Sequence, residues 1–206
     1  MLRPSKIVCV GRNYAAHARE LGNEVPPAPM LFFKPPSALI GPGETIVMPA
    51  VSRQVEYEAE IGVVIGATLR GASEAEAERA LGGFVCVNDV TCRDLQKTDG
   101  QWGRAKGFDT FCPVGPTVRA GLDWRTLEVV GRVNGEERQR GRATDMHFSI
   151  PFLLAYISGI MTLVPGDLVA TGTPAGVGPL HDGDVVEVEI PGVGVLSNPV
   201  RDGTRR

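Results

Sequence analysis

The chain has 206 residues, of which 43% are hydrophobic, and this length fits a single domain that can bury a substantial core. Its 21 Lys and Arg against 24 Asp and Glu give a formal charge of -3 without any basic block, which argues against nucleic acid as a partner. We find no signal-peptide pattern and no apolar run near the ~20 residues that span a bilayer, so we expect a cytoplasmic protein that binds no membrane.

Short β-branched runs separated by Gly and Pro predict a strand-rich fold, in one domain over residues 1–206. Taken in chain order, the expected strands cover residues 6–10, 30–34, 45–48, 56–66, 84–89, 112–118, 127–133, 136–141, 167–171, 184–190 and 194–198. The pair Asn134-Gly135 predicts a hairpin turn. Helices are expected from Tyr14 to Leu21, over the segment SEAEAERAL with a capping box of Ser73 and Glu76, and after Ser149.

The first expected helix carries His17 and Glu20, which are three residues apart and therefore lie on one helix face. A carboxylate beside an imidazole orients the ring and raises its basicity, as is needed to take a proton from water. Spacing alone favours a plainer alternative, an ordinary surface helix that carries two polar residues.

The segment EYEAEIGVVIG places Glu56, Glu58 and Glu60 at alternate positions of the expected strand 56–66, and hence on one face. Neighbouring carboxylates would then lie about 7 Å apart and repel each other. A solvated strand face is one explanation. The apolar run that follows is typical of a strand buried on both faces, which favours a bound cation instead. Ligation by carboxylates alone indicates Mg²⁺ or Mn²⁺, because zinc sites recruit His or Cys.

A third ligand is expected at Asp89, where the apolar run from Phe84 to Val87 leads into Asn88-Asp89 at the end of a strand. By itself Asp89 is more typical of a turn or of a helix N-cap. It becomes a candidate ligand only together with Glu58 and Glu60.

Other residues are ambiguous by themselves. Lys106, between Ala105 and Gly107, has the default interpretation of a solvent-facing lysine. The glycine-rich GTPAGVG near the C terminus lacks the Lys-Ser/Thr of a phosphate loop, but its backbone N–H groups and the Thr173 hydroxyl can hold a carboxylate. Trp102 and Trp124 are interpreted as packing residues, and the four cysteines as small core residues.

Six segments in the same order resemble the fumarylacetoacetate hydrolase family, in its short single-domain branch of acylpyruvate hydrolases and oxaloacetate decarboxylases. They are GRNYAAHARE (11–20), LFFKPPSALIGPG (31–43), YEAEIGVVIG (57–66), NDVTCRDLQ (88–96), AKGFDTFCPVGP (105–116) and PGDLVATGTPAGVGPL (165–180). The resemblance spans nearly the whole chain. It implies an α+β, strand-rich fold, a mixed β-roll with a few short helices, and a homodimer.

The resemblance also assigns the metal site. It implies that a divalent ion, Mg²⁺ or Mn²⁺, is held by Glu58, Glu60 and Asp89. Glu56 then lies outside the ligand set, at the rim of the site.

The same resemblance implies roles for residues around the metal. The pair His17 and Glu20 lies on a lid segment that orders over substrate, with His17 as general base, and Lys106 points at the metal site, where its charge can stabilise an enolate or oxyanion. Arg12 and Gln96 are candidates for hydrogen bonds to a keto acid, although Arg12 suits a structural ion pair equally well. The turn that contains Thr173 faces the substrate.

These expectations define a divalent-metal-dependent hydrolase that cleaves a C–C bond in 2,4-diketo acids (acylpyruvates), giving pyruvate and a carboxylic acid. Such a substrate can chelate the metal through its carboxylate and 2-keto oxygens, so that the metal stabilises a carbanion next to the ketone. An oxaloacetate decarboxylase or a 2-hydroxyhepta-2,4-diene-1,7-dioate isomerase would use the same site. A non-catalytic binding protein stabilised by a metal is a further alternative, although it has no need of His17, Glu20 and Lys106 beside the ligands.

Overall fold

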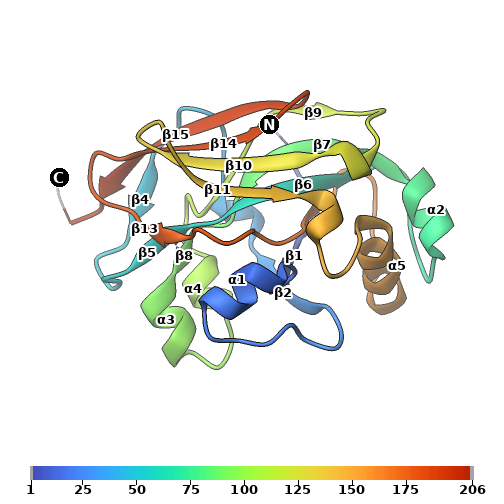
Figure 1. Cartoon of the computed structure of the whole chain (residues 1–206), viewed down its shortest axis with the longest axis horizontal. Coiled ribbons are helices and arrows are strands. Elements are labelled where there is room, and N and C mark those ends of the chain that lie inside the picture. Colours follow the sequence, from blue (N-terminus) through green and yellow to red (C-terminus); the bar gives the residue numbers. More distant parts are fainter. Residues whose placement is uncertain (1, 205–206) are drawn as a thin grey trace.

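The computed structural model describes residues 2–204, in which strands form three sheets (Figure 1). The largest is a seven-stranded mixed sheet with the spatial order β2 (Met30–Lys34), β1 (Ile7–Gly11), β12 (Leu168–Ala170), β6 (Ala59–Ile65), β7 (Leu81–Asn88), β9 (Cys112–Arg119) and β3 (Leu39–Ile40). Within it β1 runs parallel to β12 and β3 runs parallel to β9, whereas the other pairs are antiparallel.

Two smaller sheets complete the strand framework. The five-stranded sheet has the order β11 (Glu136–Arg142), β10 (Glu128–Val133), β14 (Val185–Ile190), β15 (Gly194–Asp202) and β4 (Ile46–Met48). The three-stranded sheet has the order β13 (Gly178–Pro179), β5 (Val55–Tyr57) and β8 (Thr91–Cys92). These curled mixed sheets confirm the expected strand-rich α+β fold, a mixed β-roll with a few short helices.

The helices are α1 (Ala15–Glu20), α2 (Glu74–Arg79), α3 (Arg93–Thr98), α4 (Gly103–Lys106) and α5 (Ile150–Ile160). Figure 1 shows α1, α3 and α4 gathered on one side of the strands, with α2 and α5 at one end. Among residues 2–204, none of these helices combines the length and the apolar character that crossing a membrane requires.

Strand β6 is central, because it pairs with β12 on one side and β7 on the other, and all seven of its residues are buried. Alternate side chains enter two different cores. One face, with Ile61 and Val63, packs toward the five-stranded sheet and α5, while Val64 on the other face packs with Val85 and Leu168 inside the curled sheet. Burial on both faces explains the unbroken apolar run.

Local signals in the sequence are confirmed where one residue type controls the backbone. Ser73 and Glu76 form the capping box of α2, and Ser149 accepts a bond from the backbone N–H of Phe152 at the start of α5. Asn134 and Gly135 both have positive φ, 53° and 79°, in the turn that joins β10 to β11.

The expected strand 56–66 is wrong as a single element, because it is interrupted at Glu58. Before this residue β5 belongs to the three-stranded sheet, and after it β6 belongs to the seven-stranded sheet. The Glu58 backbone N–H donates to the Asn88 side chain at 3.0 Å, and its carbonyl accepts from the Asp89 N–H at 2.9 Å. The helices α3 and α4 and the two-residue strands β3, β8 and β13 were not expected.

Candidate active site

Three buried carboxylates converge where the chain passes from β5 to β6 and where β7 ends. Glu58, Glu60 and Asp89 each offer one oxygen that lies within 4.8 Å of the others. Their residues are 4%, 1% and 0% exposed, respectively. In a regular strand the backbones of Glu58 and Glu60 would stand about 7 Å apart, and here the strand is interrupted at Glu58 while the side-chain oxygens converge. The structure therefore brings together the three predicted metal ligands.

Buried cations surround two of these carboxylates. The Lys106 ammonium lies 2.9 Å from Glu58 Oε2 and 2.7 Å from Asp89 Oδ2, and it also donates to the Thr91 hydroxyl at 2.8 Å. Lys34, at the end of β2, donates to Asp89 Oδ1 at 2.6 Å. Burial favours the neutral forms of such groups, so each ion pair compensates for the loss of water around its partner.

Arg93, at the start of α3, binds two glutamates. Its Nη2 lies 2.6 Å from Glu58 Oε1, and its Nε lies 2.7 Å from Glu56 Oε2. Glu56 is 5% exposed and also accepts a bond from the Gln54 side chain at 2.6 Å. The expectation that Glu56 lies at the rim of the site is therefore wrong: the three glutamates are all buried, and Arg93 neutralises the third.

The protein's own charges around the site do not balance when all four carboxylates are ionised. Four buried carboxylates, on Glu56, Glu58, Glu60 and Asp89, face three buried cations, on Lys34, Arg93 and Lys106. Glu60 has no cationic partner among residues 2–204, and its Oε2 accepts from the Gly172 N–H at 2.8 Å. An oxygen-only donor set with one uncompensated negative charge fits a hard dication such as Mg²⁺ or Mn²⁺.

This imbalance separates the pKa values of the two glutamates. Burial alone would raise the pKa of Glu58, but the Lys106 ammonium and the Arg93 guanidinium outweigh it and hold that pKa well below its usual range. Burial raises the pKa of Glu60 well above its usual range, and the nearby Asp89 and Glu58 charges raise it further.

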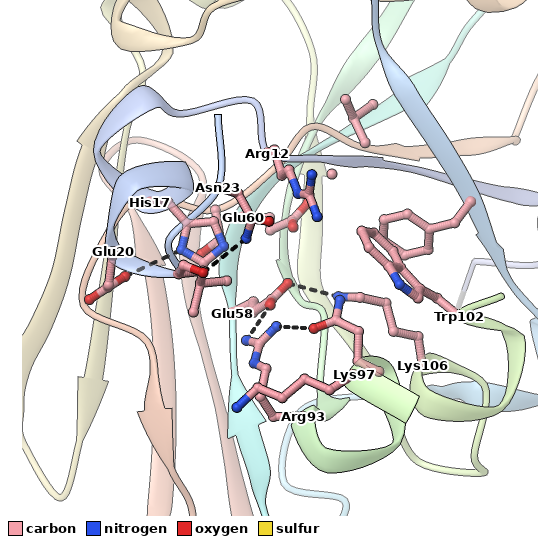
Figure 2. Close-up of a pocket in the computed structure, with 16 residues that line it drawn as sticks. Arg12, His17, Glu20, Asn23, Glu58, Glu60, Arg93, Lys97, Trp102 and Lys106 are labelled. Carbon is pink, nitrogen blue, oxygen red and sulfur yellow. Dashed lines mark hydrogen bonds and ion pairs between the residues drawn. The ribbon is translucent and has the colours of Figure 1, made fainter. Parts of the chain in front are cut away.

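A cavity of about 500 Å³ opens over the carboxylates, and Figure 2 shows the side chains that line it. It is lined by eight of the nine residues predicted for the site, namely Arg12, His17, Glu20, Glu58, Glu60, Gln96, Lys106 and Thr173. The ninth, Asp89, is fully buried beneath them, where it contacts Lys34 and Lys106.

His17 and Glu20 form one wall of the cavity. His17 Nδ1 lies 3.3 Å from Glu20 Oε2, and the His17 side chain is 6% exposed against 34% for that of Glu20. The Glu20 carboxylate also accepts bonds from the Gly176 N–H, at 3.0 and 3.2 Å. If Nδ1 donates to Glu20, the neutral ring presents Nε2 as a base.

Asn13, two residues before the first residue of α1, holds the start of this helix in place. Its side chain donates to the carbonyls of Thr171 and Phe148, at 2.8 and 3.1 Å, and accepts from the Phe148 N–H at 2.8 Å. These bonds tie the start of α1 to the end of β12. Sequence reasoning did not single out Asn13.

The remaining predicted residues differ in how much of their bonding capacity is already used. Lys106 directs its ammonium at the carboxylates, and although burial lowers its pKa, Asp89 and Glu58 raise it to about 12. The Gln96 side-chain oxygen accepts from Arg93 at 2.5 Å. The Arg12 guanidinium makes no hydrogen bond or ion pair with any described residue. Among the two interpretations of Arg12, the structural ion pair is therefore excluded within residues 2–204.

The glycine-rich turn over residues 172–176 does hold carboxylates, but they belong to the protein. Its Gly172 and Gly176 N–H groups bind Glu60 and Glu20. The Thr173 hydroxyl donates to the Ala59 carbonyl at 2.9 Å and accepts from Gln139 at 2.7 Å. Thus the Gly172 and Gly176 N–H groups, which were expected to be free for a ligand, bind two carboxylates of the protein that line the cavity.

Several contributors were missed. Lys34 and Arg93 were not predicted, although both occur in segments that carry the family resemblance, LFFKPPSALIGPG and NDVTCRDLQ. Trp102 was interpreted as a packing residue, yet it lines the cavity. Its ring meets the Phe32 ring edge-on, with 5.3 Å between the ring centroids. A hydrophobic wall of this kind has no local sequence signature.

Comparison with known proteins identifies the family of the chain. The family model described as fumarylacetoacetate (FAA) hydrolase C-terminal matches residues 6–201. A mitochondrial oxaloacetate tautomerase of Arabidopsis thaliana is 45% identical over 195 residues, which cover 92% of this chain and 87% of that protein.

Two solved structures are similar along almost the whole chain. A 5-carboxymethyl-2-hydroxymuconate delta-isomerase from Mycobacterium smegmatis has a TM-score of 0.91 and 45% identity, covering 98% of this chain and 80% of its own. A fumarylpyruvate hydrolase from Pseudomonas aeruginosa, in complex with Mn²⁺ and pyruvate, has a TM-score of 0.91 and 32% identity, covering 98% and 91%.

Proposed function

Because the chain belongs to the fumarylacetoacetate hydrolase family, we propose that it is a divalent-metal-dependent enzyme that hydrolyses a C–C bond in 2,4-diketo acids, giving pyruvate and a carboxylic acid. One observation carries the proposal. The carboxylate cluster of Glu58, Glu60 and Asp89 and the pair His17 and Glu20 belong to one site, with all but the underlying Asp89 lining a single cavity. A metal that only stabilised the fold would not need a base beside it.

Glu58, Glu60 and Asp89 would hold the ion, Mg²⁺ or Mn²⁺. Such an ion, when bound, supplies a Lewis acid that stabilises negative charge on the 2-keto oxygen of the substrate. A bound dication would also change the local charge from one negative to one positive, which suits an anionic substrate. The Mn²⁺ complex of the related fumarylpyruvate hydrolase supports this assignment.

The residues of this chain account for the remaining steps. Glu20 orients His17 through Nδ1, and His17 Nε2 takes a proton from water, which attacks the distal carbonyl carbon of the substrate. The C–C bond then breaks, and its electron pair remains on the carbon next to the 2-keto group, where it takes up the proton that His17 removed from water. Lys106, with its ammonium beside the carboxylates, adds positive charge near that keto group.

Arg12 and Gln96 would bind the acid groups of the substrate. Arg12 is the strongest candidate, because its guanidinium lines the cavity without any partner in the described part of the chain. Charge-assisted hydrogen bonds to a carboxylate are stronger than neutral ones, and guanidinium can form two at once. Thr173 also lines the cavity and would contact the substrate there, although its hydroxyl already bonds to the Ala59 carbonyl and to Gln139.

A second candidate reaction is supported by the relatives. Proteins 45% identical to this chain are named oxaloacetate tautomerase and 5-carboxymethyl-2-hydroxymuconate delta-isomerase. Both names describe the movement of a proton in an unsaturated or keto acid, which needs a base and a stabilised enolate but no attacking water. Decarboxylation of oxaloacetate would require the same stabilisation.

A substrate panel separates these reactions. Purified protein is incubated with acetylpyruvate, fumarylpyruvate, oxaloacetate and a hydroxymuconate-type dienol, each with Mg²⁺, with Mn²⁺ and with excess chelator. Hydrolysis produces pyruvate and one equivalent of a carboxylic acid, decarboxylation produces pyruvate and carbon dioxide, and tautomerisation changes the enol absorbance without producing pyruvate. Decay of every substrate at the buffer rate, whether or not metal is added, would refute the proposed enzyme activity.

A further inference from the structure

The turn over residues 172–176 contacts both chemical parts of the site. At its start, the Gly172 N–H donates to Glu60 at 2.8 Å, and at its end, the Gly176 N–H donates to Glu20 at 3.0 Å. Five consecutive residues thus connect the carboxylate cluster to the carboxylate that orients His17. The position of the turn therefore determines the position of one group relative to the other.

Two side chains outside the cavity hold this turn in place. The Tyr57 hydroxyl donates to the Gly176 carbonyl at 2.9 Å. The Gln139 amide donates to the Thr173 hydroxyl and the Pro174 carbonyl, each at 2.7 Å, while its oxygen accepts from the Ala59 N–H at 2.9 Å. Because Tyr57 and Ala59 flank Glu58, these bonds tie the turn to the segment that carries the predicted metal ligands.

Gly176 itself has little freedom to move. Its φ of 103° is in the region that favours glycine, and a Cβ at this position would lie 1.9 Å from the Arg138 carbonyl oxygen of β11. The residue is therefore packed directly against the backbone of β11, with its N–H bound to Glu20 and its carbonyl bound to Tyr57.

The helix that carries His17 needs such an external support. With six residues, α1 is too short to be stable by itself, and its N-cap residue makes no capping hydrogen bond through its side chain. Figure 2 shows His17 and Glu20 on this helix, directed toward the cavity that Glu58 and Glu60 also line. A misplacement of about 1 Å at a catalytic group can reduce a rate about 100-fold.

We propose that Tyr57 and Gln139 are positioning residues for the proposed reaction, which place Glu20, and through it His17, over the metal ligands by fixing the Gly176 N–H. Neither side chain lines the cavity, and both residues are buried, at 4% and 1% exposure. Their effect is therefore on geometry rather than on contact with substrate. This inference rests on the proposed function for its kinetic consequences, but its structural part can be measured separately.

The kinetic test is the Tyr57→Phe variant, which removes one hydroxyl. We expect kcat to fall about tenfold, with KM and the Mn²⁺ affinity within about twofold of the wild type. Tyr156→Phe, on α5 and outside the cavity, is the matched control and should behave as wild type. In a Glu20→Ala background, Tyr57→Phe should cost less than about twofold, because the group it positions is gone.

Hydrogen exchange provides a test that requires no turnover. In Tyr57→Phe, peptides covering α1 and Gly176 should exchange faster than in wild type, whereas those covering α5 should be unchanged. The positioning role would be overturned if peptides covering α1 and Gly176 exchanged at the wild-type rate in Tyr57→Phe. It would also be overturned if Tyr57→Phe reduced kcat by the same factor with and without Glu20. If the wild type turns over no keto acid, the proposed function fails, while the exchange measurement still decides whether Tyr57 holds α1.

Discussion

In the carboxylate wall, formed by Glu58 and Glu60 with Asp89 beneath them, Glu58 and Asp89 are each held by two cations, whereas in the α1 wall, formed by His17 and Glu20, a single carboxylate orients His17. Asp89 contacts Lys34 and Lys106, and Glu58 contacts Lys106 and Arg93. Glu20, the sole ionic partner of His17 within residues 2–204, is itself one-third exposed. The carboxylate wall thus consists of buried, paired charges, whereas the α1 wall depends on one ion pair whose carboxylate is partly exposed.

The comparison implies that substitutions on the two walls have different consequences. Removing one member of a buried ion pair leaves the other uncompensated in a medium of low dielectric constant, which costs folding free energy. Removing a residue of the α1 wall changes the position or presence of a proton acceptor and leaves the core intact. The four predictions below test this separation, beginning with the largest expected effect.

The first prediction concerns Lys34→Met, which leaves Asp89 Oδ1 buried without its cation. We expect the free energy of unfolding in urea to fall by about 3–5 kcal/mol. The control is Arg138→Met, which breaks an exposed pair with Glu136 and should change stability by less than about 1 kcal/mol. Similar effects of the two substitutions would remove the distinction between the walls.

The second prediction concerns Glu60→Gln, the cluster member that has no cationic partner within residues 2–204. We expect the Mn²⁺ affinity, measured by calorimetry, to fall by about 100-fold or more, because a ligand is lost. Burial and the neighbouring carboxylates raise the pKa of Glu60, so at pH values below that pKa a metal ion must displace a proton from the wild type. Affinity should therefore increase as pH rises toward that raised pKa and level off above it. An unchanged affinity in the variant would exclude Glu60 as a ligand.

The third prediction addresses the α1 wall through His17→Ala. Turnover should fall about 100-fold or more, because the general base is lost, while Mn²⁺ affinity remains as in wild type. Arg19→Ala, an exposed neighbour on the same helix, should retain activity. If His17→Ala weakened metal binding as much as Glu60→Gln does, the two walls would have to be regarded as one unit.

The smallest effect is expected at Arg12, which belongs to neither ion-pair system. Arg12→Gln should raise KM about tenfold for a keto acid with a second carboxylate, with kcat changed only a few-fold, because a charge-assisted hydrogen bond is lost. Arg12→Lys, which keeps the charge, should recover part of the loss. An identical KM in all three proteins would show that Arg12 does not contact the substrate.

The sequence pattern indicated a cation site near Glu58, Glu60 and Asp89, and the family resemblance singled out these three and left Glu56 out; the structure brings the same three together. The sequence was not sufficient to predict how they meet. Strand alternation places Glu58 and Glu60 about 7 Å apart, and the interruption at Glu58 depends on the Asn88 side chain, 30 residues away in sequence. Contacts of this kind depend on tertiary structure and leave no local pattern.

The buried cations illustrate the same limit. Lys34 ends an edge strand next to Pro35, where a lysine is ordinarily exposed, but the curl of the sheet directs it to Asp89. Arg93 opens α3, a helix that the sequence did not predict and whose N-cap residue, Cys92, makes no capping hydrogen bond through its side chain. By contrast, the capping box at Ser73 and the turn at Asn134 are decided by neighbouring residues and were predicted correctly.

The burial of all four cysteines has a practical consequence for following α1 in solution. Burial raises the pKa values of Cys86 and Cys112 to about 12 and that of Cys92 to about 11, and it also raises that of Cys9, so thiolate, the form that reacts with maleimides, is scarce in the folded protein. A cysteine introduced at the exposed Ala16 would therefore accept a spin label or fluorophore selectively, without removal of the native thiols. Spectroscopy on that label would test whether α1 moves during turnover.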